Sequence, residues 1–244
     1  MDTTIYAELE PSRDWNHLYW RLRALSGIYG RLDIPDVPLG KPNISAPVLA
    51  VLARTMFGAD VIAHLRVRDH NIVSLKSIIK SMVLAGVARH VYLNGDKPKQ
   101  GDYCGQTMTP EETVAYGARR GAETGLLLSL RKTDSEIMER LAVKADYYYV
   151  TRCDFTRNCV GRLEKIAGWA GERGSRLAVY IVMGTEVNRS YLDTNNIPYT
   201  SQDNIVNIIE KLSGITDRII LSAPGDGDFI IWIAERLAQA GLLQ

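Results

Sequence analysis

Three expected strands in the sequence end in residue types that carry out proton transfer. The acid Glu8 ends the first apolar run, the imidazole of His64 lies in the third, and the acid Asp96 follows the fourth. The carboxyl ends of parallel strands share one edge of a sheet, where α/β proteins build their sites. A carboxyl group between low-dielectric walls can have a raised pKa and act as a general acid. The three residues therefore indicate an acid–base site.

Each of these residues also has a structural alternative. Glu8 shares a strand face with Glu10 and either donates protons or pairs with an arginine. His64 either contacts a ligand or is a satisfied core histidine. Asp96 lies in an Asn-Gly-Asp sequence and either forms a turn or accepts from the N–H groups of a heterocycle.

Cationic and glycine-rich segments adjoin the same strand ends. Arg66 and Arg68 alternate along the third strand and Asp69 opens the next loop, which predicts a network of ion pairs at the rim or ligand contact, or both. Arg152 ends the sixth strand. The Gly-Asp-Gly-Asp sequence at 225–228 is either a plain turn or a set of amides for an anion at a helix N-terminus.

The elements that position these residues alternate regularly along the chain. Strands are expected at 4–9, 29–34, 61–66, 90–94, 125–129, 147–151, 177–183 and 218–222. Helices are expected at 13–25, 45–57, 73–85, 110–121, 133–143, 157–173, 202–213 and 228–240. Eight strand–helix units predict a (β/α)8 (TIM) barrel, and no Pro- or Ser-rich linker divides it, so residues 1–244 are expected to form a single domain. The alternative is a doubly wound sheet, which the missing Gly-rich dinucleotide fingerprint disfavours.

The composition limits the partners of the chain. It has 244 residues, with 29 Lys and Arg against 28 Asp and Glu, so its near-neutral charge gives no reason to expect nucleic acid. No apolar run approaches the roughly 20 residues needed to span a bilayer, and we expect a cytoplasmic protein without a membrane partner. Cys104, Cys153 and Cys159 lack the spacing of a zinc site. A disulfide between Cys153 and Cys159 would need a loop that brings them together. We expect both thiols to be reduced and no metal to be bound.

Several motifs give the chain a resemblance to the methylenetetrahydrofolate reductase family of flavin-dependent barrels. They are Tyr6-Ala7-Glu8-Leu9-Glu10-Pro11, Asp36-Val37-Pro38-Leu39-Gly40, Ala63-His64-Leu65, Arg68-Asp69-His70-Asn71 and Asn94-Gly95-Asp96-Lys97-Pro98. The resemblance implies catalysis by Glu8, which protonates the pterin, and by Asp96, which binds the pterin ring. It also implies that FAD lies against His64.

The resemblance implies further contacts to cofactor and substrate. The residues expected to bind the cofactor are His64, Arg66, Asn94, Asp96 and Arg140. The residues expected to bind the substrate are Glu8, Asp96 and Arg152. Arg152 stands where the family has a pterin-binding glutamine, and as a permanent cation it is suited to a carboxylate or a phosphate.

The implied activity is reduction of a methylene-pterin to a methyl-pterin in one-carbon metabolism. Reduced FAD would deliver the hydride and a nicotinamide would recharge it, with FMN or no flavin as the alternatives. Two other functions fit the same barrel: a flavin-free methyltransferase linked to a pterin or corrinoid, and a non-catalytic accessory subunit. The expected partners are a small-molecule pterin and either further copies of the chain or a redox partner subunit.

Overall fold

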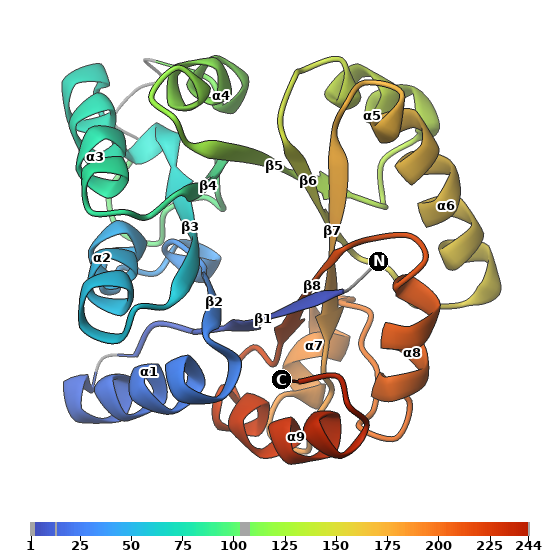
Figure 1. Cartoon of the computed structure of the whole chain (residues 1–244). Coiled ribbons are helices and arrows are strands. Elements are labelled where there is room, and N and C mark those ends of the chain that lie inside the picture. The colour runs from blue at the N-terminus through green and yellow to red at the C-terminus, as the bar shows by residue number, and fades with distance from the viewer. Residues whose placement is uncertain (1–2, 13, 103–107, 244) are drawn as a thin grey trace. The chain divides into compact units, whose positions relative to one another are not determined.

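The computed structural model describes residues 3–12, 14–102 and 108–243, so Cys104 lies outside the described residues. Eight parallel strands follow one another in chain order in a closed barrel (Figure 1). The predicted (β/α)8 barrel is confirmed, and the doubly wound alternative is wrong. By its internal contacts the chain divides into two compact units. They are the N-terminal unit, Leu9–Leu127, and the C-terminal unit, Met1–Glu8 with Leu128–Gln244.

The strands lie within two residues of the predicted positions at both ends. They are β1 (Thr4–Glu8), β2 (Arg31–Ile34), β3 (Asp60–Arg66), β4 (Arg89–Leu93), β5 (Glu123–Ser129), β6 (Tyr147–Thr151), β7 (Arg176–Val182) and β8 (Arg218–Ser222). The helices are α1 (Trp15–Tyr29), α2 (Ala46–Phe57), α3 (Ile72–Leu84), α4 (Pro110–Ala118), α5 (Asp134–Leu141), α6 (Arg157–Gly171), α7 (Arg189–Thr194), α8 (Ile205–Leu212) and α9 (Asp228–Gln239). Two short 3-10 helices, η1 (Pro38–Gly40) and η2 (Val67–Asp69), follow β2 and β3. Of these, α7, η1 and η2 were not predicted.

Local signals in the sequence explain where the helices of the N-terminal unit begin. A capping box starts α4, where Glu112 N–H donates to Thr109 Oγ1 at 3.1 Å and Thr109 N–H donates to Glu112 Oε2 at 2.7 Å.

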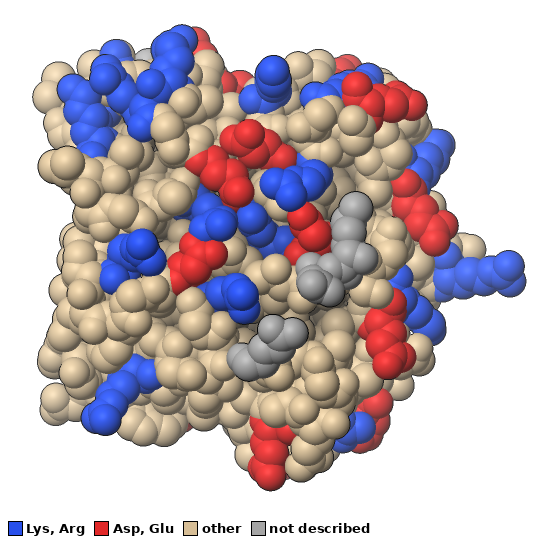
Figure 2. All heavy atoms as spheres, viewed as in Figure 1, with Lys and Arg blue, Asp and Glu red and all other residues tan. Residues whose placement is uncertain are grey.

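Basic side chains gather over α3 and α4 in Figure 2. By the distances between their atoms, Lys76 Nζ of α3 and the Arg120 guanidinium after α4 each lie 5.3 Å from the centre of the Tyr116 ring.

Tyrosines organise the amino ends of the strands in the C-terminal unit. Side chains alternate along β6: the rings of Tyr147 and Tyr149 lie 6.2 Å apart, whereas Tyr148 donates its hydroxyl to the carbonyl of Arg140 on α5. The buried Arg218 guanidinium lies 3.6 Å from the Tyr147 ring centre and donates to Tyr149 Oη at 2.9 Å. Burial raises the pKa of Tyr147 to about 12. This cation–π layer lies at the end of the barrel that serves stability.

A buried histidine in β4 makes the stability of the N-terminal unit depend on pH. His90 Nε2 lies 3.0 Å from the carbonyl of Val87 and Nδ1 lies 3.0 Å from Tyr92 Oη, which fits a neutral ring protonated on Nε2. Gly117 of α4 leaves room for the Tyr92 hydroxyl, where any Cβ would collide with it. Burial lowers the pKa of His90 to about 4.

Replacing His90 by glutamine should flatten the pH dependence of unfolding. As the pH falls from 6.5 towards 4, the unfolded chain takes up a proton on His90 that the native state does not, so wild-type stability decreases. This one group predicts a loss of about 2 kcal/mol between pH 7 and pH 5. Urea unfolding of wild type, His90→Gln and the control His17→Gln at several pH values measures it. Equal pH slopes in all three proteins would contradict the assignment.

Among the described residues, no helix combines the length and the apolarity needed to cross a membrane.

Candidate functional site

Glu8 lies at the carboxyl end of β1 with a defined hydrogen-bond partner. Its side chain is half-buried, and Oε1 accepts a hydrogen bond of 2.7 Å from the hydroxyl of Ser222. β1 and β8 are paired through Ala7 and Leu221, so Glu8 and Ser222 occupy the adjoining ends of neighbouring strands. A buried hydroxyl donor fixes the orientation of the carboxylate. Both residues belong to the C-terminal unit.

His64 forms a buried pair with an acid of the neighbouring strand in the N-terminal unit. Its Nε2 lies 2.9 Å from Asp33 Oδ1, and the two residues are 4% and 0% exposed. The parallel register of β2 and β3 places Asp33 beside Ile62 and Ile34 beside Ala63, which brings the carboxylate to the imidazole. Asp33 was not among the predicted site residues, because the strand register that joins the pair cannot be read from the sequence. The pair holds the imidazole in one orientation inside the barrel wall.

Arg66 is the centre of a network that joins three loops at the carboxyl ends of β2, β3 and β4. Its guanidinium donates Nε to Asp69 Oδ2 at 2.6 Å and Nη2 to Asp69 Oδ1 at 3.3 Å. It also donates to two backbone carbonyls, from Nη1 to Val37 at 3.3 Å and from Nη2 to Asp96 at 2.9 Å. The side chain is 1% exposed, so the rim network expected from the sequence is present in this unit.

Two glycines allow these loops to approach each other. A Cβ on Gly95, which has φ +72°, would lie 2.8 Å from the Arg66 guanidinium. A Cβ on Gly40 would collide with the carbonyl of Lys97, and the Gly40 carbonyl accepts from Lys99 N–H at 2.8 Å. The Asn-Gly-Asp segment thus holds its shape by contact with β3 and η1.

Asp36 is a buried acid that fixes the start of α2. Its carboxylate accepts from Arg66 N–H at 3.0 Å and from Ala46 N–H at 3.3 Å. Burial raises the pKa of Asp36, although these two backbone donors act in the opposite direction. The following residues Val37 and Leu39 have φ of 45° and 59°, a left-handed conformation that is rare for such side chains.

Asn94 and Asp96 are exposed at the end of β4. The backbone carbonyl of Asp96 accepts from Arg66, while the residue as a whole is exposed. The structural interpretation of Asp96 therefore accounts for its backbone contact. The pterin-binding role of its carboxylate stays a prediction.

Arg140 lies on α5, away from the carboxyl ends of the strands. Its carbonyl accepts from the hydroxyl of Tyr148, the tyrosine that faces the helix layer. Burial lowers the pKa of the Arg140 guanidinium. This position does not fit the predicted contact with a flavin diphosphate. Arg66 does not fit a flavin contact either, because its donors bond to protein acceptors in a fully buried setting.

Arg152 directly follows β6 and points to the end of α7. Its Nη1 donates to the carbonyls of Asn195 at 3.4 Å and Asn196 at 3.3 Å. Arg131, in the loop after β5, donates Nη2 to the same Asn196 carbonyl. Arg131 was not among the predicted site residues.

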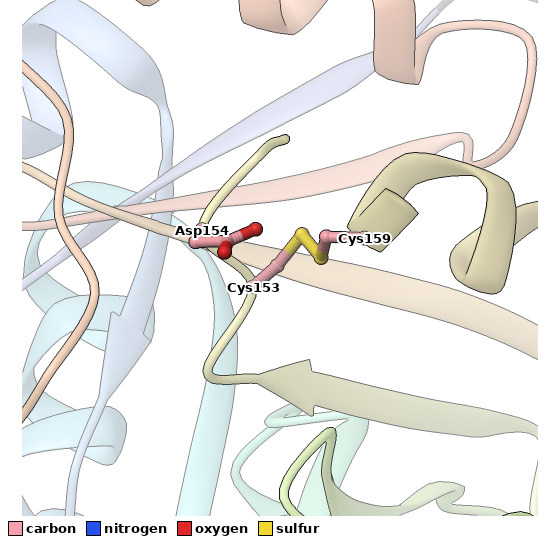
Figure 3. Close-up of side chains that lie close together, drawn as sticks. All are labelled: Cys153, Asp154 and Cys159. Carbon is pink, nitrogen blue, oxygen red and sulfur yellow. A yellow bond between two sulfur atoms is a disulfide. The ribbon is translucent and has the colours of Figure 1, made fainter. Parts of the chain in front are cut away.

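Cys153 and Cys159 form a disulfide, so the prediction of reduced thiols is wrong (Figure 3). Their Cα atoms lie 6.0 Å apart, because the chain turns back at Asp154 before α6 begins. Asp154 Oδ1 accepts from the N–H and the hydroxyl of Thr156, and the Thr156 hydroxyl in turn accepts from Cys159 N–H at 3.4 Å. Cys153, Asp154 and Cys159 are close enough to share a metal ion, but the two sulfurs are bonded to each other.

The Gly-Asp-Gly-Asp segment after β8 forms a turn. Asp226 N–H donates to Ala223 O at 2.9 Å and Phe229 N–H donates to Asp226 O at 3.0 Å. The turn alternative is confirmed. The carboxylates of Asp226 and Asp228 at the start of α9 disfavour an anion there, since they already complement the helix dipole.

Comparisons with known proteins agree on the fold. No protein-family model and no curated protein sequence matches the chain. A solved structure of a mutant tryptophan synthase alpha-subunit from Pyrococcus furiosus is similar, with a TM-score of 0.65, 11% identity and 98% of each chain covered. Tryptophan synthase from M. tuberculosis gives 0.62 at 9% identity, covering 100% of this chain and 94% of the other. Deoxyribose phosphate aldolase from Aeropyrum pernix gives 0.57 at 12% identity, with 98% and 91% covered. At this level of sequence identity, these similarities establish the (β/α)8 fold and do not establish an activity.

Proposed function

We propose that the protein reduces a methylene-pterin to a methyl-pterin, with Glu8 as the proton donor. The observation that carries the proposal is the half-buried Glu8 carboxyl group at the end of β1, oriented by the Ser222 hydroxyl at 2.7 Å. Catalytic groups of (β/α)8 barrels come from the carboxyl ends of their strands. The resemblance of residues 6–11, 63–65 and 94–98 to the reductase family supplies the substrate class.

The reaction needs one proton and one hydride. Glu8 donates its proton to the amine nitrogen that leaves the methylene bridge, and the other nitrogen then forms an iminium with the one-carbon unit. A reduced nicotinamide, bound as a co-substrate, would supply the hydride that turns the iminium carbon into the methyl group, and it would be released in the oxidised form. The Asp96 carboxylate accepts hydrogen bonds from the amino-pyrimidine edge of the pterin, an acceptor-only role that suits an ionised acid.

Schiff-base chemistry is one alternative, and it needs a lysine that the described strands of the barrel do not supply. Carbonyl-lyase reactions that proceed through a Schiff base need a lysine amine. None of the eight strands, as the structure describes them, contains a lysine. Acid–base chemistry by carboxyl groups is therefore favoured over amine catalysis at the strand ends.

The proposal is tested by direct assay of the purified protein. We expect methyl-pterin to form from a methylene-tetrahydropterin and NADH or NADPH, with deuterium from a 4-deuterated nicotinamide appearing in the methyl group. Parallel reactions with added FAD or FMN, and an absorbance spectrum of the protein, determine whether a flavin takes part. Absence of product with every donor would refute the reductase. Methyl transfer from methyl-pterin to a corrinoid would then support the flavin-free methyltransferase.

A further inference from the structure

Two arginines from different strand ends converge on one carbonyl oxygen in the C-terminal unit. Arg131 follows β5 and Arg152 follows β6, and both donate to the carbonyl of Asn196 just after α7. Arg152 also donates to the carbonyl of Asn195. The two guanidinium groups therefore lie side by side at the edge of the barrel where sites are built.

The electrostatics of this arrangement favour an anion. Two guanidinium groups that share one acceptor repel each other, and the repulsion is stronger near a protein surface than in bulk water because the effective dielectric is lower. The end of α7 offsets part of this repulsion, but a six-residue helix carries only a fraction of a charge there. Arg131 donates through Nη2 to the Asn196 carbonyl, and a guanidinium fork matches the oxygens of a carboxylate or phosphate.

The backbone at Arg152 is strained, whereas that at Asn196 is an ordinary helix end. Arg152 has φ 73°, a left-handed conformation that is unfavourable for such a side chain and is found at functional sites. Asn196 has φ 50° two residues after α7 ends, where a left-handed asparagine is a usual helix C-cap. Arg173 provides an internal comparison. It donates Nη1 to the carbonyl of Trp169 at the end of α6 at 2.7 Å, without a positive φ.

A polar cavity of about 380 Å³ lies along the same two segments. One wall contains Asp154 and Phe155, which follow Arg152 closely, and another contains Tyr199 to Ser201, which follow Asn196. The remaining lining includes the side chains of Asn204, Asn207 and Lys211. The lining thus combines hydroxyl, amide and ammonium groups with the carboxylate of Asp154, which accepts from Thr156 at the start of α6. Arg131 and Arg152 lie outside this lining. The volume falls within the range of small-ligand sites.

We propose that Arg131 and Arg152 bind an oxyanion, a phosphate or carboxylate at the tail of the substrate, with the tail lying along this cavity. The identity of the tail rests on the proposed function, whereas oxyanion binding does not. The substrate would therefore be a conjugated, anionic molecule rather than a bare heterocycle.

Calorimetric titration of the full chain with inorganic phosphate and with glutarate tests oxyanion binding directly. We expect at least one of the two to bind wild type, more weakly as salt is raised. Arg131→Gln and Arg152→Gln should each weaken binding by about tenfold or more, because each removes a charged hydrogen-bond donor. Arg152→Lys should be intermediate, since it keeps the charge without the fork. The ligand that binds distinguishes a phosphate tail from a carboxylate tail.

Arg173→Gln is the matched control, because it removes the same kind of arginine–carbonyl bond elsewhere in the unit. Circular dichroism checks the fold of each variant. The proposal would be overturned if neither anion bound to folded wild type. It would also be overturned if binding were equal in wild type, Arg131→Gln, Arg152→Gln and Arg173→Gln. Binding by a protein without reductase activity would refute the proposed function and leave the oxyanion site intact. In an active enzyme, the arginine variants should raise KM more than they lower kcat.

Discussion

Replacing Glu8 by glutamine should lower kcat for methylene-pterin reduction by about 10²- to 10⁴-fold, the usual contribution of a general acid. Glutamine keeps the shape of the side chain and can still accept from the Ser222 hydroxyl, so the strand ends should stay in place. It has no acidic proton to give to the leaving amine. The measurement is single-turnover formation of methyl-pterin over a range of pH.

Two further variants separate proton donation from general disturbance of the site. Glu10→Gln changes the other acid of the same motif and should remain close to wild type. Ser222→Ala removes the group that orients Glu8 and should lower kcat by a smaller factor than Glu8→Gln, with altered pH dependence. If folded Glu8→Gln turned over at the wild-type rate, Glu8 would not be the proton donor.

Replacing Arg66 by methionine should cost about 2–3 kcal/mol of stability, because it removes the donor of two backbone carbonyls and of a half-buried carboxylate. The change leaves Asp69 without its bidentate donor and leaves the carbonyls of Val37 and Asp96 without their N–H partners. Urea unfolding followed by fluorescence of Trp15 and Trp20, which belong to α1 of the same unit, measures the effect.

The exposed Arg31 supplies the control for this prediction. Arg31→Met also removes an arginine from a strand of the N-terminal unit, but it should change stability by no more than about 0.5 kcal/mol. A double-mutant cycle of Arg66→Met with Asp69→Asn isolates the ion pair from the carbonyl contacts. A loss below 1 kcal/mol in Arg66→Met would show that the three loops hold together without this guanidinium.

The sequence was sufficient for the barrel because each strand is an apolar run between helical patterns with clear start signals, such as Thr109 and Glu112. It was insufficient for α7, because six residues show too little periodicity to stand out. The loops between β2, β3 and β4 also escaped prediction in detail. Their shape depends on the left-handed backbone of Val37 and on Arg66 bonds to carbonyls about 30 residues away, and neither leaves a pattern in the sequence.

The candidate site, too, was predictable from the sequence only in part. The positions of Glu8, Arg152 and Asp96 at strand ends follow from the strand pattern alone. The partners of the predicted residues do not, because Ser222 is 214 residues from Glu8 and Asp33 is 31 residues from His64. The disulfide was missed for a local reason, since it depends on the turn at Asp154 that brings the start of α6 back to the end of β6.

The Cys153–Cys159 bridge closes a small covalent ring around residues 154–158 (Figure 3). A protease that cuts inside this ring would leave both fragments attached, so the nicked protein would migrate intact on a gel without reductant and as two pieces with it. The backbone that carries Arg152 is thereby tethered to α6 even after hydrolysis of the intervening peptide. Nicked protein should accordingly keep its affinity for oxyanions until the thiols are freed.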